Sequence, residues 1–511
     1  MMAHLPIVPI LLPFLAAALL LVLGRLSLPA QRGLALLAVL AQIGAALALL
    51  LAVSGGDILV YRLGDWPAPW GIVLVADRLS AWMVLITTLL ALWALIFASN
   101  GIDTQGRHFH VLFQMQLFGL GGAFLTGDLF NLFVFFEILL IASYGLALHG
   151  GGKARTRAGL HYVVMNLAGS AVFLFAAGLI YASMGSLNMA DLAARASTLA
   201  PDMLGLARAG GLLLLAVFAL KAALLPLHLW LPAAYSGTSA PVAALFAIMT
   251  KVGIYAILRS HTLMFGDSAG ALSGLFAPWL LPLALATIVI GTLGMLAADT
   301  LGRLAGYLVL VSVGTLLTGM SLGTQGIAAA LYYLPHSTFT AALLFLLIDA
   351  IKRRRLLHGD GFTPDADMPR HALWGSLFFA AAVAAAGLPP LSGFVGKFLI
   401  LRAAPEQPWV WVVILLAALL AVVALARAGS QVFFNSHSPH DAPVPDPGAG
   451  TADTARPGAS SAHELLAVAG LLGLILALTV FAGPALDYAN ATAQQLSEPA
   501  RYIGAVLGVK P

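Results

Sequence analysis

Five ionisable side chains stand inside long apolar stretches of this sequence. Glu137, for example, is the only Asp, Glu, Lys or Arg between residues 129 and 152. An ionised side chain at the centre of a lipid bilayer costs about 2.5–3.5 kcal/mol, and such residues usually mark a path for ions or protons. We therefore treat these five as candidate functional residues: Glu137, Lys221, Lys251, His336 and Lys397.

These residue types suit the movement of protons. Burial disfavours the charged forms of lysine and glutamate, so both can gain and lose a proton closer to neutral pH than in water. Histidine titrates near neutral pH without any shift. A structural role is the alternative in each case: a hydrogen-bonded acid at Glu137, a lysine nearer the interface at Lys251, or a packed core histidine at His336. We favour a proton path through all five.

Four further residues are candidate relays. Tyr144 follows Glu137 by seven residues, which places both on one face of a helix. Thr340 follows His336 by one turn and can relay a proton only through its hydroxyl. His228 and His161 are either relay groups or packing and interface residues.

Composition assigns the chain to the polytopic membrane proteins. It is 61% hydrophobic and 9% charged, with a mean hydropathy of +0.97, whereas soluble domains are about 25% charged. The net charge of +4 gives no reason to expect nucleic acid as a partner. The absence of cysteine excludes iron–sulfur ligation and disulfides. We expect no cofactor and no metal centre.

A bilayer core of about 30 Å requires about 20 apolar residues per helix. We expect about fourteen transmembrane segments in an all-α fold. They lie near residues 5–23, 33–53, 79–98, 111–126, 129–148, 160–183, 210–231, 241–258, 275–297, 304–320, 326–349, 372–401, 408–430 and 464–484.

Prolines interrupt two of these segments beside a candidate lysine. Pro226 follows Lys221 by five residues, and Pro389 and Pro390 precede Lys397. Proline removes a backbone hydrogen bond and frees carbonyl groups. Broken helices at membrane depth line polar cavities and form ion sites in transporters. Both lysines are therefore expected beside a helix break.

The distribution of loop charges predicts the orientation. Lysine and arginine are concentrated in loops that follow odd-numbered segments, and such loops are normally cytoplasmic. We expect both termini on the outer side of a bacterial inner membrane.

Four stretches resemble a known superfamily. They are residues 126–137 (TGDLFNLFVFFE), residues 226–253 from Pro226-Leu227-His228 to Lys251-Val252-Gly253, the segment around His336, and residues 387–397. This pattern is similar to the proton-translocating antiporter superfamily that Mrp-type Na⁺/H⁺ antiporters share with the membrane arm of respiratory complex I. Within it, the chain most resembles the D-type subunit of Mrp (Pha or Mnh) antiporters.

The resemblance implies a fold and a role for each site residue. It implies fourteen helices, two inverted five-helix repeats at helices 4–8 and 9–13, and broken helices 7 and 12. The family's acid on helix 5, lysines on helices 7, 8 and 12 and central histidine match the five candidates. Many relatives carry lysine at the positions of Thr340 and His161, so this chain departs from the pattern there.

We expect a non-enzymatic subunit of a multi-subunit Na⁺ or K⁺/proton antiporter, with other membrane subunits as partners. The alternative is a proton-pumping subunit of a complex I-type quinone oxidoreductase or a hydrogenase complex. The expected parts are an N-terminal three-helix segment at 1–110, inverted repeats at 111–260 and 275–434, a flexible polar loop at 435–463, and a C-terminal helix and tail at 464–511.

Overall fold

The computed structural model describes residues 2–24, 26–355, 358–363, 365, 368–434 and 462–508. Within these ranges twelve helices are long and apolar enough to cross a membrane, by length and composition. This confirms the polytopic class. Most of the expected flexible loop at 435–463 lies outside the described residues.

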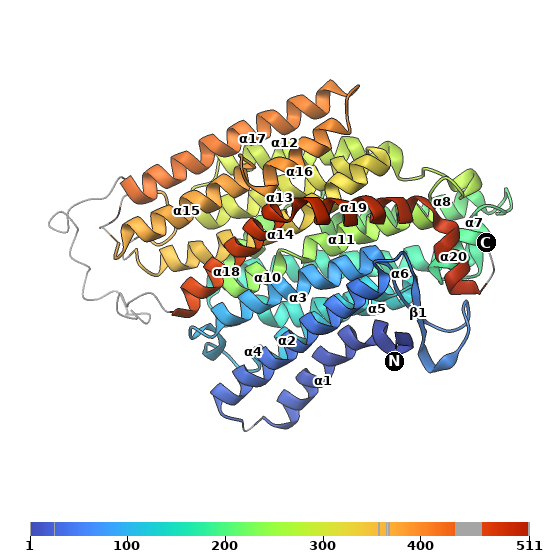
Figure 1. Cartoon of the computed structure of the whole chain (residues 1–511), viewed down its shortest axis with the longest axis horizontal. Coiled ribbons are helices and arrows are strands. Elements are labelled where there is room, and N and C mark those ends of the chain that lie inside the picture. The colour runs from blue at the N-terminus through green and yellow to red at the C-terminus, as the bar shows by residue number, and fades with distance from the viewer. Residues whose placement is uncertain are drawn as a thin grey trace.

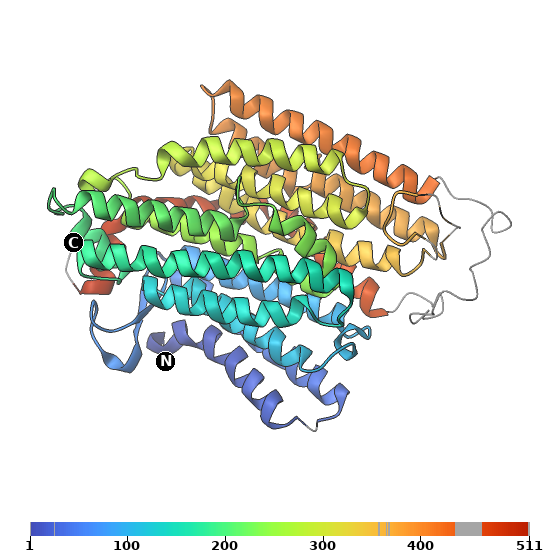
Figure 2. The ribbon, with the colours of Figure 1, turned by 180° about the vertical axis from the view of Figure 1, so that it is seen from behind.

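The long helices run side by side along the length of the molecule, and both chain ends lie at one end of this bundle (Figures 1 and 2). We call this end the terminal face. In chain order the α-helices are α1 Val8–Val22, α2 Leu28–Val53, α3 Arg78–Ala98, α4 Phe109–Leu125, α5 Leu129–Ala147, α6 Lys153–Met184, α7 Met189–Ala196, α8 Leu204–Ala222, α9 Trp230–Gly237, α10 Ala240–Phe246, α11 Met249–Arg259, α12 Ala277–Leu296, α13 Leu301–Met320, α14 Gly323–Lys352, α15 His371–Ala386, α16 Ser392–Arg402, α17 Pro408–Gly429, α18 Ala462–Val480, α19 Ala482–Ser497 and α20 Pro499–Leu507.

Each of the fourteen expected segments contains helix, but two helices are too short to count among the twelve candidate spans. These are α4, with 17 residues, and α15, with 16 residues. The helix α15 is short because the segment 372–401 divides into α15 and α16, as the two prolines predict. The segment 210–231 divides in the same way, since α8 ends at Ala222 and α9 begins at Trp230.

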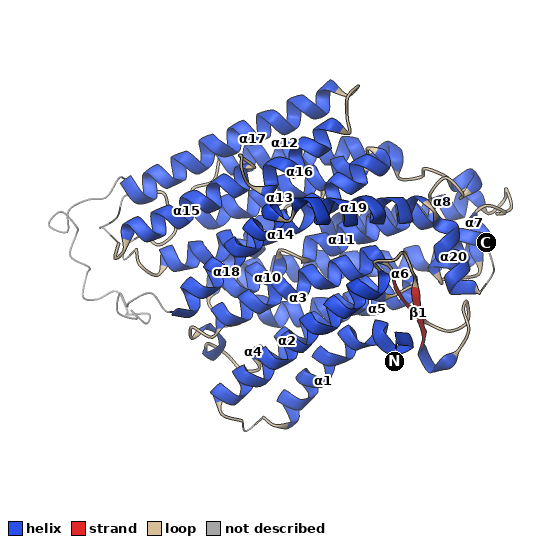
Figure 3. Ribbon diagram, in the orientation of Figure 1, coloured by secondary structure: helices blue, strands red, loops and turns tan. Residues whose placement is uncertain are grey.

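The chain also contains a small β-hairpin, which an all-α prediction overlooks. Strands β1, Leu59–Arg62, and β2, Val73–Ala76, pair antiparallel with Leu59 opposite Ala76. Figure 3 shows β1 at the terminal face. Four-residue strands are too short for a period-two pattern to separate them from the apolar helices on either side. β2 leads directly into Asp77, which caps α3 by accepting a hydrogen bond from the Ser80 amide at 2.9 Å.

The helix α14 forms the centre of the bundle. Nearly all of its membrane-spanning window, 94%, is buried inside the protein. It packs against α3, α10, α13, α15 and α16, and along its length against α18 and α19. Two tertiary hydrogen bonds fix it: the Trp82 indole donates to the Leu331 carbonyl at 3.1 Å, and the Tyr332 hydroxyl donates to the Leu478 carbonyl at 3.2 Å. A helix so completely covered by protein can hold polar side chains away from lipid.

Candidate functional site

Glu137 lies in the middle of α5 and is half-buried. Its carboxylate accepts a hydrogen bond from the Ser170 hydroxyl of α6. That hydroxyl also lies 3.1 Å from the Asn166 carbonyl, one turn earlier on the same helix. The Glu137 carboxylate is therefore held by an uncharged side chain of the neighbouring helix.

Lys221 occupies the last turn of α8, directly before the helix break, and is 8% exposed. Its Nζ donates to the Asn166 Oδ1 atom at 3.2 Å and lies 5.9 Å from the centre of the Phe136 ring. Among the ion pairs of the described residues, none joins Lys221 to Glu137. Ser170 and Asn166, one turn apart on α6, instead each bond to one of the two charges.

Lys251 is fully buried on α11, and its Nζ has no hydrogen-bond partner among the described residues. Its helix packs closely on α8, because a Cβ atom at Gly253 would lie 2.4 Å from the Ala222 nitrogen. A small cavity of about 10 Å³, roughly the space of one water molecule, lies at this junction and is lined by Lys221, Asn166, Trp230, Met249 and Val252 among others. A single water there can contact Lys221.

A second cluster surrounds the break between α15 and α16. The two ring nitrogens of His336 lie 2.9 Å from the Ser392 Oγ and 3.1 Å from the Ala384 carbonyl. Lys397 donates to the Ala386 carbonyl at 2.8 Å. Both carbonyls belong to the last turn of α15, where the break removes the usual amide partners four residues further on. The Ala384 carbonyl also accepts from the Gly387 amide at 3.0 Å.

The second cluster also contains a cavity. Its volume is about 30 Å³, enough for about two water molecules, and Ser312, Tyr333, His336, Thr340 and Lys397 line it. The Thr340 Oγ1 lies 3.4 Å from His336 Nε2. The structure therefore brings His336, Thr340 and Lys397 together around one cavity.

The other candidate relays are placed differently. Tyr144 is half-buried and packs edge-on against Tyr162, with 5.5 Å between ring centres. His228 is buried in the break after α8, and its Nδ1 has no partner in the part of the chain that the structure describes. His161 is exposed on the surface of α6 and takes no part in either buried cluster. The prediction of a path role for His161 thus has no support from its position.

Sequence reasoning missed the uncharged members of both clusters, namely Asn166, Ser170 and Ser392. A search for charge alone passes over them. Tyr162, Asn166 and Ser170 recur at intervals of four, so they form a polar stripe on one face of an otherwise apolar helix. That polar stripe is the feature of the sequence from which Asn166 and Ser170 could have been identified. Ser392 had a weaker signal, its place two residues after the proline pair.

The described residues of this arrangement offer little to a metal ion. No group of three His, Cys, Asp or Glu side chains that could hold a metal ion occurs within the described ranges. Lys221 and Lys397 bond to neutral oxygens rather than to carboxylates. A lysine without a carboxylate partner is not locked in its charged form, so it can exchange a proton with water in the adjacent cavity.

Comparison with known proteins places the chain among transporters. Residues 126–423 match the family model described as NADH:quinone oxidoreductase/Mrp antiporter, transmembrane. The chain is 42% identical to the D-type subunit of a probable K⁺/H⁺ antiporter of Rhizobium meliloti, over 99% of this chain and 97% of that protein. It is 35% identical to the D-type subunit of a Na⁺/H⁺ antiporter of Alkalihalophilus pseudofirmus, over 99% of this chain and 100% of that one.

Solved structures agree with this placement. A chain of the Mrp complex from Dietzia sp. is similar, with a TM-score of 0.82, 28% identity and coverage of 99% of both chains. A chain of respiratory complex I from Thermus thermophilus has a TM-score of 0.75 at 24% identity, over 97% of this chain and 100% of that one. The second likeness concerns the fold alone.

Proposed function

We propose how protons move through this chain, which belongs to the NADH:quinone oxidoreductase/Mrp antiporter family. It is a multi-pass membrane protein and the D-type subunit of a multi-subunit Na⁺/H⁺ or K⁺/H⁺ antiporter. In our proposal, Glu137, Lys221, Lys251, His336 and Lys397 pass protons, and cation exchange by the assembled complex depends on them. The cation is Na⁺ or K⁺, the two ions that the names of the relatives give.

The observation that carries the proposal is the connection from Glu137 to Lys221. The Ser170 hydroxyl bonds the carboxylate, and Asn166, one turn away, accepts from the ammonium group. A charge change at Glu137 therefore alters the electric field at Lys221 without locking the lysine in an ion pair. The adjoining cavity supplies room for the water that a proton needs to leave Lys221.

Glu137 also supports an interface with another subunit. It is half-buried in this chain although it lies mid-helix in a membrane span. Contact between a carboxylate and lipid is unfavourable, so a neighbouring subunit is expected to cover it. We further propose fourteen membrane crossings in two inverted repeats, and both termini on the outer side of a bacterial inner membrane. The bias of loop charges and the two helix breaks support this arrangement.

The test is Glu137→Gln in the complete complex. Na⁺- or K⁺-driven dissipation of a proton gradient is measured in everted vesicles from antiporter-deficient cells that express all subunits. We expect exchange to fall by roughly tenfold or more, because glutamine cannot carry the charge that tunes Lys221. Glu406→Gln is the matched control, since Glu406 is an exposed glutamate in the loop after α16. Wild-type exchange in Glu137→Gln would contradict the proposal.

A proton-pumping role in a redox complex is the alternative, because complex I contains the same fold. The two functions predict different partners. We expect the purified complex to contain only membrane antiporter subunits. Co-purification of quinone-reductase or hydrogenase subunits in stoichiometric amounts would support the alternative instead.

A further inference from the structure

A buried ion pair lies at the terminal face, outside both clusters. The Arg259 guanidinium at the end of α11 donates two hydrogen bonds to the Asp77 carboxylate, at 2.6 and 2.8 Å. Arg259 is 3% exposed and Asp77 is 1% exposed. Burial would raise the pKa of Asp77, but the charge and hydrogen bonds of Arg259 outweigh burial and hold that pKa below its ordinary value. Asp77 is therefore ionised in the closed pair.

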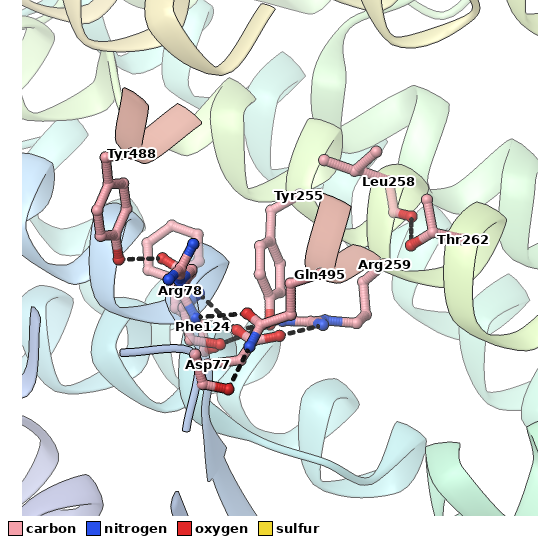
Figure 4. A network of polar contacts seen from close by, with 11 residues as sticks. Asp77, Arg78, Phe124, Tyr255, Leu258, Arg259, Thr262, Tyr488 and Gln495 are labelled. Carbon is pink, nitrogen blue, oxygen red and sulfur yellow. Dashed lines mark hydrogen bonds and ion pairs between the residues drawn. The ribbon is translucent and has the colours of Figure 1, made fainter. Parts of the chain in front are cut away.

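Tyr255 links this pair to the unpartnered Lys251. Lys251, Tyr255 and Arg259 follow one another at intervals of four residues, so they lie along one face of α11. The Tyr255 hydroxyl donates to the Phe124 carbonyl at 2.8 Å, and lies 3.5 Å from both the Ser80 Oγ and an Arg259 nitrogen. Figure 4 shows Tyr255 and Arg259 converging on Asp77. Residues four apart on a helix are neighbours, so Tyr255 lies between Lys251 and Arg259 on this face of α11.

The far side of the ion pair adjoins a third small cavity. It measures about 10 Å³, the space of about one water molecule, and Asp77, Arg259, Thr262, Gln495 and Tyr502 are among its lining residues. Polar groups thus continue from Lys251, through Tyr255 and the ion pair, to a cavity near the terminal face.

A contribution to the stability of the fold is a weak explanation for the presence of this ion pair. Replacing a buried ion pair with apolar residues is often neutral or stabilising. Other bonds already fix the start of α3: the Arg78 amide donates to Gln495 at 3.1 Å, and the Tyr488 hydroxyl donates to the Arg78 carbonyl at 2.8 Å. These two contacts attach α3 to α19 without Asp77 or Arg259.

We propose that Tyr255, Arg259 and Asp77 form a gate at the terminal end of the proton path that begins at Lys251. This inference rests on the proposed function. When closed, the Arg259 side chain occupies the route, because it lies between the Tyr255 hydroxyl and the cavity near the terminal face. To open the gate, Lys251 releases a proton through one water to the Tyr255 oxygen. Tyr255 then passes its own hydroxyl proton to Ser80. Ser80 in turn passes its hydroxyl proton to the Asp77 carboxylate. One proton moves in total, and neutral Asp77 no longer neutralises Arg259, so the pair separates.

The test compares two tyrosine-to-phenylalanine changes in the complete complex. Tyr255→Phe removes the hydroxyl between Lys251 and the gate. Tyr488→Phe also removes a hydrogen bond from a hydroxyl to a backbone carbonyl, but one that only attaches α19 to α3. Exchange in everted vesicles is divided by the amount of assembled complex in the same membranes. We expect Tyr255→Phe to lower exchange per complex by at least about tenfold, and Tyr488→Phe to leave it near the wild-type value.

Two results would overturn the gate. One is wild-type exchange per complex in Tyr255→Phe. The other is an equal decrease of exchange per complex in both variants, since the Tyr255 hydroxyl would then matter no more than that of Tyr488. Glu137→Gln, measured alongside, separates this inference from the proposed function: a loss in Glu137→Gln with none in Tyr255→Phe removes the gate and keeps the path.

Discussion

Three of the charged residues in the membrane interior bond to neutral groups rather than to opposite charges. Lys221 bonds to an amide, Lys397 to a backbone carbonyl, and Glu137 to a hydroxyl. A carboxylate beside each lysine would stabilise its protonated form and slow the release of the proton. Neutral acceptors instead leave the two protonation states closer in free energy. The uncharged residues of α6 should therefore matter for transport almost as much as the charged ones.

Ser170→Ala tests that reasoning. The change removes the hydrogen bond to Glu137 and leaves the carboxylate unpaired on that side, a loss of about 1.5–3 kcal/mol for a bond to a charged group. We expect exchange per assembled complex to fall by roughly tenfold, the equivalent of about 1.4 kcal/mol. The measurement is the vesicle assay described above.

Ser183→Ala is the control on the same helix. Ser183 is also buried, but its hydroxyl bonds only to the Leu179 and Ile180 carbonyls of α6 itself. Exchange should stay near the wild-type value in this variant. An equal decrease in both variants would mean that α6 tolerates no loss of a serine, and would remove the case for Ser170 as a connecting residue.

At the scale of secondary-structure elements, the helix breaks position the candidate functional residues. The break after α15 exposes carbonyls that His336 and Lys397 use, and the sequence predicts this break from two adjacent prolines. The sequence also predicts most helices, because long apolar runs leave few alternatives in a membrane. It cannot predict that Asn166 of α6 faces Lys221 of α8, since that contact depends on how the two helices pack.

Gly393→Ala tests how tightly the break is built. A Cβ atom at Gly393 would lie 2.3 Å from the His336 Nε2 atom, so the α15–α16 junction or the imidazole must move. Overpacking of this kind costs about 1–3 kcal/mol. We expect lower thermal stability of the purified complex and a loss of exchange, because His336 loses its contacts with Ser392 and Ala384.

The matching control is Gly473→Ala, which lies in α18. No described atom lies within 4 Å of a Cβ atom built at Gly473. Alanine in an open helical position should be neutral or stabilising by about 0.5–1 kcal/mol, and exchange should not change. Normal exchange in Gly393→Ala would show that His336 has more freedom than its close packing implies.

Across the whole molecule, the ion pairs of the described residues lie near the ends of the bundle, while the charges within it stay unpaired. Arg354, two residues after the end of α14, donates to Glu464 of α18 at 2.7 Å, and Asn100 donates to the same carboxylate at 2.7 Å. The Arg354 guanidinium also lies 4.2 Å from the centre of the Trp374 ring. These contacts connect three distant parts of the chain. Sequence reasoning could not pair Arg354 with Glu464, because 110 residues separate them.

This division predicts that the Arg354–Glu464 pair serves stability and Glu137 serves transport. Glu464→Gln leaves the buried Arg354 guanidinium without its carboxylate, and breaking a buried pair costs about 3–5 kcal/mol. We expect less assembled complex and a lower melting temperature, with exchange per complex close to wild type. The double variant Arg354→Met/Glu464→Leu removes both charges and should recover part of the lost stability. If Glu464→Gln instead assembled normally and lost exchange, the pair would belong to the proton path, and that path would extend to the face opposite the termini.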